Sequence, residues 1–258
     1  MSKPPKATAV PIQRAYTRGG RPVRVALVGL PNSGKSTLFK TVASTAVQTG
    51  ELAGTHSAYN ECAVQIGLDE VRLVDLPSIG SLHDLAHDER VTLQYLLWGD
   101  KRPPIAAHEP GRSPAPFAPP DVIIQVVDAT ALARHLEFTL ELSRLGRPMV
   151  IALNMMDDAA RKGLHIHHRR LSKQLGIPVV PTTTVMGMGI MEVFIAALAS
   201  VRKRGGPHPR ASNRQLTQAL EPLSAALDQH EILEAFGMPH ALLLALAAAD
   251  DRYFRHAL

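Results

Sequence analysis

The sequence contains a single cysteine, Cys62, among 258 residues, which excludes an internal disulfide and fits a reducing compartment. Aromatic residues make up only 4%, which disfavours a protein that works mainly by stacking side chains on bases. The N-terminus lacks the apolar stretch of a signal peptide, and the apolar run 241–249 is far shorter than the roughly 20 residues of a membrane helix. The sequence therefore predicts a cytoplasmic, soluble chain, and leaves open that it is a fragment of a membrane protein.

Acidic residues are absent from positions 1–50, which hold eight Lys and Arg, although the whole chain has a net charge of only +5. Residues 1–22 are rich in Pro, Lys and Arg and are predicted to form a disordered basic arm. Such an arm can contact RNA or anionic lipid, but an inert solubilising tail is the commoner case. No RNA-binding module is recognisable, so we expect no nucleic-acid partner.

Apolar runs and helical spacing alternate along the middle of the chain. Buried strands are predicted at 23–28, 71–74, 122–127, 149–153 and 177–180, and helical spacing is present at 36–43, 132–145, 164–175 and 190–201. This alternation predicts an α/β fold with a mostly parallel, doubly wound sheet. Ligands of such sheets bind at the carboxyl ends of the strands.

The predicted α/β domain spans residues 23–204 and is interrupted once. Residues 99–120 contain seven prolines and little apolar periodicity, so they are predicted to form a long surface loop. After a Gly-Gly-Pro linker at 205–207, the Leu- and Ala-rich remainder has helical spacing. Residues 207–258 are therefore predicted to form a small helical appendage.

A glycine-rich loop follows the first predicted strand. Residues 29–36 have the spacing G-x-x-x-x-G-K-S of a P-loop NTPase, between a strand and a helix. Backbone N–H groups of such a loop surround phosphate oxygens, and the helix N-terminus faces the same charge. Lys35 is expected to contact the β- and γ-phosphates and to serve catalysis, while the Ser36 hydroxyl is expected to ligate Mg²⁺. The predicted phosphate-binding residues are Gly29, Pro31, Asn32, Ser33, Gly34, Lys35, Ser36 and Thr37.

Polar residues also end two other predicted strands. Asp75 follows the second strand, where a carboxylate can hold Mg²⁺ through water, with a turn or helix-cap role as the alternative. The segment Asn154-Met155-Met156-Asp157 follows the fourth. The Asp157 carboxylate can accept from guanine N1–H and its amino group, a donor pair that adenine lacks, so GTP or GDP is favoured over ATP. An Asx turn is the alternative for this loop.

Several motifs together resemble one family. They are GLPNSGKS at 29–36, LVDLP at 73–77, VVDA at 126–129, ALNMMD at 152–157 and PTTTVMGMGI at 181–190. In combination they resemble the cytosolic GTPase domain of bacterial ferrous-iron transport protein B (FeoB). This resemblance implies a G domain with an attached helical domain and a membrane permease domain, at the cytosolic face of the inner membrane. It also implies that Asn32 helps to hold a potassium ion against the phosphates; self-association stays open.

The first switch departs from the family pattern G-x-x-A-G-x-T. Gly54 matches, but His56 occupies the position of the Mg²⁺-ligating threonine and Thr55 lies one position early. Histidine is a poor ligand for Mg²⁺, which prefers oxygen. Either Thr55 becomes the ligand after a shift of one residue, or this ligand is missing.

The second switch and the base-capping loop also differ from the family. Ser78 follows Asp75-Leu76-Pro77 where a glycine is usual, and Ser78 keeps the N–H that can meet a γ-phosphate but has less backbone freedom. Ile79 stands where Ras-like GTPases have a water-orienting glutamine, a lack that the family shares. Thr184-Val185 aligns with the guanine-capping pair, and the Val185 N–H can still meet the guanine O6.

Three functions are compatible with these features. The first is slow, Mg²⁺-dependent GTP hydrolysis that regulates ferrous-iron uptake by an attached membrane domain. The second is a GTP/GDP sensor with little hydrolysis, and the third is a soluble ribosome-assembly GTPase that uses the basic arm on RNA. The histidine groups at 83 and 87 and at 165–168 lack a third ligand at fixed spacing, so no metal beyond Mg²⁺ and K⁺ is predicted.

Overall fold

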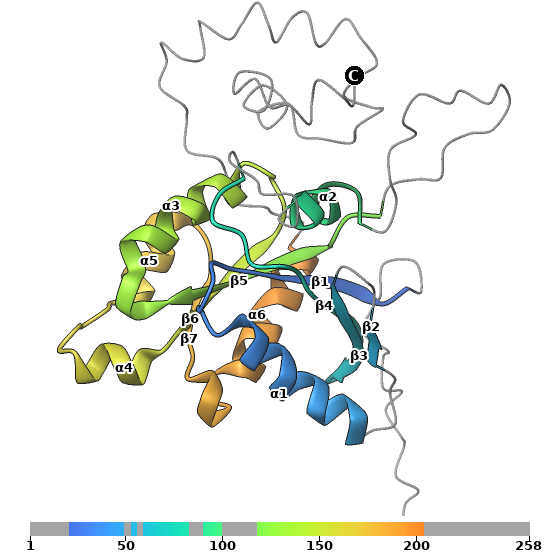
Figure 1. The fold of residues 1–258 in the computed structure, drawn as a ribbon, viewed down its shortest axis with the longest axis horizontal. Coiled ribbons are helices and arrows are strands. Elements are labelled where there is room, and N and C mark those ends of the chain that lie inside the picture. Colours follow the sequence, from blue (N-terminus) through green and yellow to red (C-terminus); the bar gives the residue numbers. More distant parts are fainter. Residues whose placement is uncertain (1–20, 49–52, 56–58, 83–89, 100–117, 204–258) are drawn as a thin grey trace, which may run out of the picture.

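The computed structural model describes residues 21–48, 53–55, 59–82, 90–99 and 118–203 (Figure 1). The predicted helical appendage at 207–258, most of the predicted loop 99–120 and nearly all of the predicted basic arm lie outside the described residues. Within these ranges, no helix is long and apolar enough to cross a membrane.

A seven-stranded sheet forms the centre of the molecule (Figure 1), in the order β2-β3-β4-β1-β5-β6-β7. The strands are β1 Val23–Val28, β2 Ala53–Thr55, β3 Asn60–Ile66, β4 Asp69–Asp75, β5 Val122–Asp128, β6 Met149–Asn154 and β7 Val179–Pro181. The five strands from β4 to β7 pair in parallel, whereas β2 and β3 pair antiparallel at one edge. The predicted α/β fold with a mostly parallel sheet is confirmed.

Helices cover both faces of the sheet (Figure 1). On one face, α1 (Lys35–Gln48) and α6 (Ile190–Arg202) bury side chains such as Leu38 and Phe194 against β1, β5 and β6. On the other face, α2 (Arg90–Trp98), α3 (Leu132–Ser143) and α5 (His168–Leu175) pack around a second core that includes Trp98 and Phe138. The short α4 (Met156–Arg161) and the 3-10 turns η2 (Ala129–Ala131) and η3 (Thr184–Met186) lie in the connections.

Four elements of the described structure were not predicted from the sequence. The strand β3 alternates buried and partly exposed residues, because it lies near the sheet edge, and it forms a hairpin with β4 through the left-handed Gly67. The helices α2 and α4 and the three-residue β2 were also missed. The predicted helix 164–175 begins only at His168, and residues 164–167 form an irregular connection after α4.

Both ends of the loop predicted at 99–120 meet at one point. The Ala118 N–H donates to the Trp98 carbonyl at 3.1 Å. Gly99 has a φ of 66° and lies so close to this contact that a Cβ on it would be 1.9 Å from the Ala118 oxygen, so only glycine fits there. Residues 99 and 118 are therefore adjacent at the end of α2.

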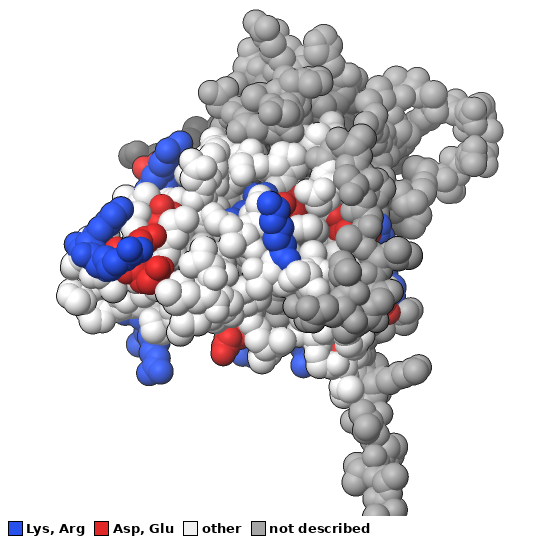
Figure 2. Space-filling model, turned by 60° about the horizontal axis from the view of Figure 1, so that its bottom comes forward, with Lys and Arg blue, Asp and Glu red and all other residues white. Residues whose placement is uncertain are grey.

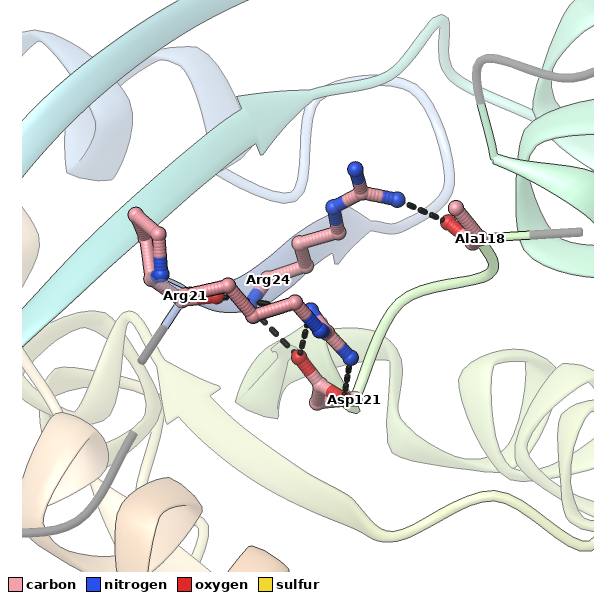
Figure 3. Close-up of polar contacts among 5 residues, drawn as sticks. Arg21, Arg24, Ala118 and Asp121 are labelled. Atoms are coloured by element: carbon pink, nitrogen blue, oxygen red, sulfur yellow. Dashed lines mark hydrogen bonds and ion pairs between the residues drawn. The ribbon is translucent and has the colours of Figure 1, made fainter. Parts of the chain in front are cut away.

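The beginning of β1 is fixed to the residue before β5 (Figure 3). Both carboxylate oxygens of Asp121 accept from the Arg21 guanidinium, at 3.0 and 2.8 Å, and Oδ2 also accepts from the Arg24 N–H at 2.9 Å. The Arg24 guanidinium donates in turn to the Ala118 carbonyl. These bonds secure the register of the two central strands at the end opposite the glycine-rich loop.

Candidate functional site

The glycine-rich loop connects the carboxyl end of β1 to the N-terminus of α1, where the sequence analysis placed it. Pro31 and Asn32 are exposed at its tip, whereas Ser33 is buried and its hydroxyl has no hydrogen-bond partner among the described atoms. Asn32 has a left-handed backbone with a φ of 63°. At its other end the loop passes directly into α1, so the backbone N–H groups of a helix N-terminus face the same space.

A buried ion pair joins this loop to β4. The Lys35 ammonium binds the Asp75 carboxylate, and the two side chains are only 5% and 7% exposed. The contact brings together the first turn of α1 and the end of a strand forty residues away in sequence. A lysine and a carboxylate buried together are thus placed at the carboxyl end of the sheet, where ligands of this fold class bind.

The Asn154 side chain holds two loops together at the end of β6. Its amide nitrogen donates to the Ser33 carbonyl at 3.0 Å, and its amide oxygen accepts from the Thr184 N–H at 3.0 Å. Gly34, with a φ of 89°, is in contact with this amide, because a Cβ there would lie 2.2 Å from the Asn154 nitrogen. Asn154 is 2% exposed, so it acts as a buried clamp between the glycine-rich loop and the η3 turn.

The loop that follows Asn154 has an uncommon backbone. Met155 adopts a left-handed conformation with a φ of 60° at the start of α4. Met155 and Asn32 are the two non-glycine residues with positive φ in the described ranges. Both lie in loops that follow the carboxyl end of a parallel strand, β6 and β1 respectively. Because such conformations cost about 1–3 kcal/mol each, their concentration here is typical of a binding site.

The residues predicted to recognise a base differ in their exposure to solvent. Thr184 is buried where its N–H donates to Asn154, whereas Val185 is 75% exposed on the η3 turn. The Asp157 carboxylate, 29% exposed, lies 3.6 Å from the Arg161 guanidinium, which also pairs with Asp158. Asp157 on α4 and Val185 on η3 are therefore both available to a ligand at the surface.

The segment after Asp75 is tethered to two elements. The Ile79 N–H donates to the Gly29 carbonyl of the glycine-rich loop at 3.3 Å, and the Ile79 side chain is fully buried. The Thr92 hydroxyl of α2 donates to the Pro77 carbonyl at 2.8 Å. Ser78 itself is partly exposed between these contacts.

A carboxylate of α3 secures the end of the same segment. Glu141 accepts from the Leu82 N–H at 2.6 Å and from the Ser81 hydroxyl at 3.0 Å. Glu141 and Thr92 were not predicted as functional residues, since an isolated Glu or Thr in a helix gives no signal of its partner. Their bonds hold the segment 76–82 against the domain.

The predicted Mg²⁺ ligands share one kind of donor atom. Ser36 is exposed at the first turn of α1, and Asp75 is held beside that turn by its ion pair with Lys35. Gly54 and Thr55 lie in β2, where Thr55 is opposite Asn60, and Asn60 in turn is opposite Asp75. Hydroxyl and carboxylate oxygens suit Mg²⁺, so the Ser36 hydroxyl and the Asp75 carboxylate fit this ion; His56 lies outside the described residues.

The family was decided by comparison with known proteins. The family model described as ferrous iron transport protein B matches residues 23–106 and 116–197, which is more than half of the chain. This chain belongs to the ferrous iron transport protein B family. The first matched segment contains the glycine-rich loop and Asp75, and the second contains Asn154, Asp157 and Thr184. The gap between the segments falls within the predicted loop 99–120.

Curated relatives of this family member are much longer than the chain. It is 32% identical over 223 residues to an Fe(2+) transport protein A/Fe(2+) transporter FeoB fusion protein of Porphyromonas gingivalis, covering 86% of this chain and 24% of the relative. It is 35% identical over 176 residues to the Fe(2+) transporter FeoB of Escherichia coli, covering 67% and 20%. The chain thus spans about a fifth to a quarter of the length of these relatives.

Solved structures of the family share the fold. The cytosolic domain of FeoB from L. pneumophila is 26% identical with a TM-score of 0.64, covering 83% of this chain and 78% of that one. An S. thermophilus NFeoB mutant bound to mGDP is 28% identical with a TM-score of 0.64, covering 80% and 72%. The FeoB G-domain from Methanococcus jannaschii is 31% identical with a TM-score of 0.55, covering 70% and 99%. The P-loop G-domain fold predicted from the sequence is therefore confirmed.

Proposed function

We propose that this chain binds GTP and GDP with Mg²⁺, hydrolyses GTP slowly, and thereby regulates ferrous-iron uptake by a membrane domain of the same protein. The observation that carries the proposal is the buried Lys35–Asp75 pair between the glycine-rich loop and β4. A nucleotide triphosphate offers its phosphates to Lys35 and to the N–H groups of the loop and of α1. Family relatives named as Fe(2+) transporters, and solved FeoB domains bound to GDP or GMPPNP, support it.

The phosphate groups are bound mainly by the loop 29–37. The predicted contacts come from Gly29, Pro31, Asn32, Ser33, Gly34, Lys35, Ser36 and Thr37. Mg²⁺ would be held by Ser36, Asp75 and Thr55, where it neutralises phosphate charge. When the nucleotide binds, the Lys35 ammonium leaves Asp75 and pairs with phosphate oxygens, while the Asp75 carboxylate pairs with Mg²⁺. Both buried charges therefore stay paired.

Guanine recognition is assigned to two loops that Asn154 connects. Asp157 accepts from N1–H and the amino group of guanine, and the Val185 N–H donates to O6. Thr184 and Met155 shape the pocket through their backbone. Since Asn154 holds the Thr184 loop to Ser33, the base and phosphate subsites are kept at a fixed separation.

Slow turnover follows from the segment 75–79. The Ile79 side chain is buried and apolar, so it cannot orient an attacking water, and catalysis depends on positioning and charge neutralisation by Lys35. Ser78 offers its N–H to the γ-phosphate, and Asn32 would hold a potassium ion there. Ser78, in place of the usual glycine, favours the second candidate function, a nucleotide sensor with very little hydrolysis.

A turnover assay distinguishes these two functions. Phosphate release from GTP is measured with Mg²⁺, in potassium and in sodium buffers, with the Lys35→Ala variant as control. We expect release above the control that is faster in potassium, and loss of the potassium effect in Asn32→Ala. Tight GTP binding without release above the control would leave only the sensor function.

Base specificity is tested by exchanging one carboxylate. Asp157→Asn should weaken GTP binding and favour xanthine nucleotides, because the amide donates where the carboxylate accepts. Asp158→Asn is the matched control, since it removes a neighbouring charge that also pairs with Arg161. Unchanged guanine affinity in Asp157→Asn would show that the base binds elsewhere.

The attachment to a membrane domain places the chain at the cytosolic face of a membrane. The length of the curated relatives supports this placement, and it disfavours the soluble ribosome-assembly GTPase. Iron uptake by cells that carry the full-length protein should fall when Lys35→Ala is introduced. Uptake equal to that of the unchanged protein would contradict a regulatory role.

A further inference from the structure

One helix face carries only positive charge. Along α5, Arg169, Arg170 and Lys173 are exposed, and they lie within one side of the helix because they are one, three and four residues apart. The opposite side, with Leu171 and Leu175, packs against the core. This face, together with Lys162 in the preceding connection, is here named the α5 basic face.

The α5 basic face is not neutralised by the domain itself. Within the described residues, none of its four cations takes part in an ion pair, whereas Arg161 pairs with Asp157 and Asp158. The sequence explains this, because residues 159–191 contain no Asp or Glu at all. Figure 2 shows Lys and Arg side chains projecting from the edge of the molecule at which α4 lies, beside the carboxylates that pair there. An unpaired cluster of this kind attracts an anionic partner.

The surroundings of the face favour lipid over nucleic acid. Residues 159–191 contain no Phe, Tyr or Trp that could stack on bases. Leu164 is 41% exposed next to the cations, and it can enter the headgroup region of a bilayer. A surface hollow lined by Ile166, His167, His168, Arg169 and Arg170 offers room for a headgroup.

We propose that the α5 basic face binds the anionic phospholipid headgroups of a bilayer and so orients the domain on the membrane. The inference relies on the proposed function only because an attached membrane domain brings such a surface within reach. Each Lys or Arg near an anionic bilayer strengthens binding about fivefold. Three of them therefore raise the partition coefficient about a hundredfold, and salt weakens the effect.

The test measures binding of the full chain to vesicles by sedimentation. Vesicles of phosphatidylglycerol and phosphatidylcholine are compared with phosphatidylcholine alone. We expect binding only to the anionic vesicles, and a loss of about a hundredfold in R169Q/R170Q/K173Q. Glutamine preserves helix propensity, so the loss reflects charge.

Two variants with the same change in net charge serve as controls. K40Q/R134Q/K203Q removes exposed cations from other elements, and K3Q/K6Q/R14Q removes them from the predicted basic arm. Both should bind anionic vesicles within a few-fold of the unchanged chain. An equal loss in either control would overturn the proposal, since net charge or the arm would then be responsible.

Two further outcomes would also overturn it. One is the absence of binding to anionic vesicles, and the other is tight binding of RNA by this face without vesicle binding. GDP affinity is measured on the same variants and should be unchanged in R169Q/R170Q/K173Q. Vesicle binding without nucleotide binding would refute the proposed function alone, and nucleotide binding without vesicle binding would refute this inference alone.

Discussion

The Asn154 clamp allows a stability prediction with a magnitude. Asn154→Ala leaves the buried Ser33 carbonyl and the buried Thr184 N–H without the partners that they have at 3.0 Å. Each unpaired buried backbone group costs about 1–3 kcal/mol. We therefore expect the free energy of unfolding without nucleotide to fall by about 3 kcal/mol. For a domain of this size, that corresponds to a Tm lower by about 6–12 °C.

The assay is urea unfolding at constant buffer, followed by circular dichroism. The midpoint should fall while the slope m stays constant, because the same surface is exposed on unfolding. Asn60→Ala is the control, since Asn60 is an exposed asparagine on β3, at the same end of the sheet and opposite Asp75. It should change stability by less than about 0.5 kcal/mol. A loss in Asn154→Ala no larger than in the control would refute the clamp and its role in spacing the two loops.

Three further predictions concern Gly34, the Lys35–Asp75 pair and His135. Gly34→Ala should abolish nucleotide binding in a fluorescent-GDP titration, because a Cβ at φ 89° would meet the Asn154 amide at 2.2 Å; normal affinity would contradict the tight approach. Lys35→Met should lower the free energy of unfolding in urea by about 3 kcal/mol, because it leaves the buried Asp75 carboxylate unpaired. The double variant Lys35→Met/Asp75→Leu should recover most of this stability. No recovery would argue against the ion pair. Burial lowers the pKa of His135, so the unfolded chain binds more protons than the folded chain below pH 6.5, and stability should fall there as pH decreases. His135→Asn should flatten this dependence in thermal scans, and an unchanged slope would assign it to other groups.

Local patterns were sufficient for the central part of the fold. The strands β1, β5 and β6 are covered on both faces, so their sequences are nearly continuous apolar runs and were predicted within one residue. The strand β3 faces the core with alternate residues only, and it was missed for that reason. The glycine-rich loop was recognisable because its spacing, its glycines and its lysine are all local in sequence.

The sequence by itself determined which residue types are available for phosphate, Mg²⁺ and guanine, because each motif is a short segment with its own geometry. Only the tertiary structure decided that Lys35 pairs with Asp75 and that Asn154 holds Ser33 to Thr184. It also decided that Glu141 secures the segment after Asp75, and that the cations of α5 stay unpaired within the described residues. The physical reason is that these contacts join residues distant in the chain, and their pairing depends on strand order and helix placement, which no local pattern contains.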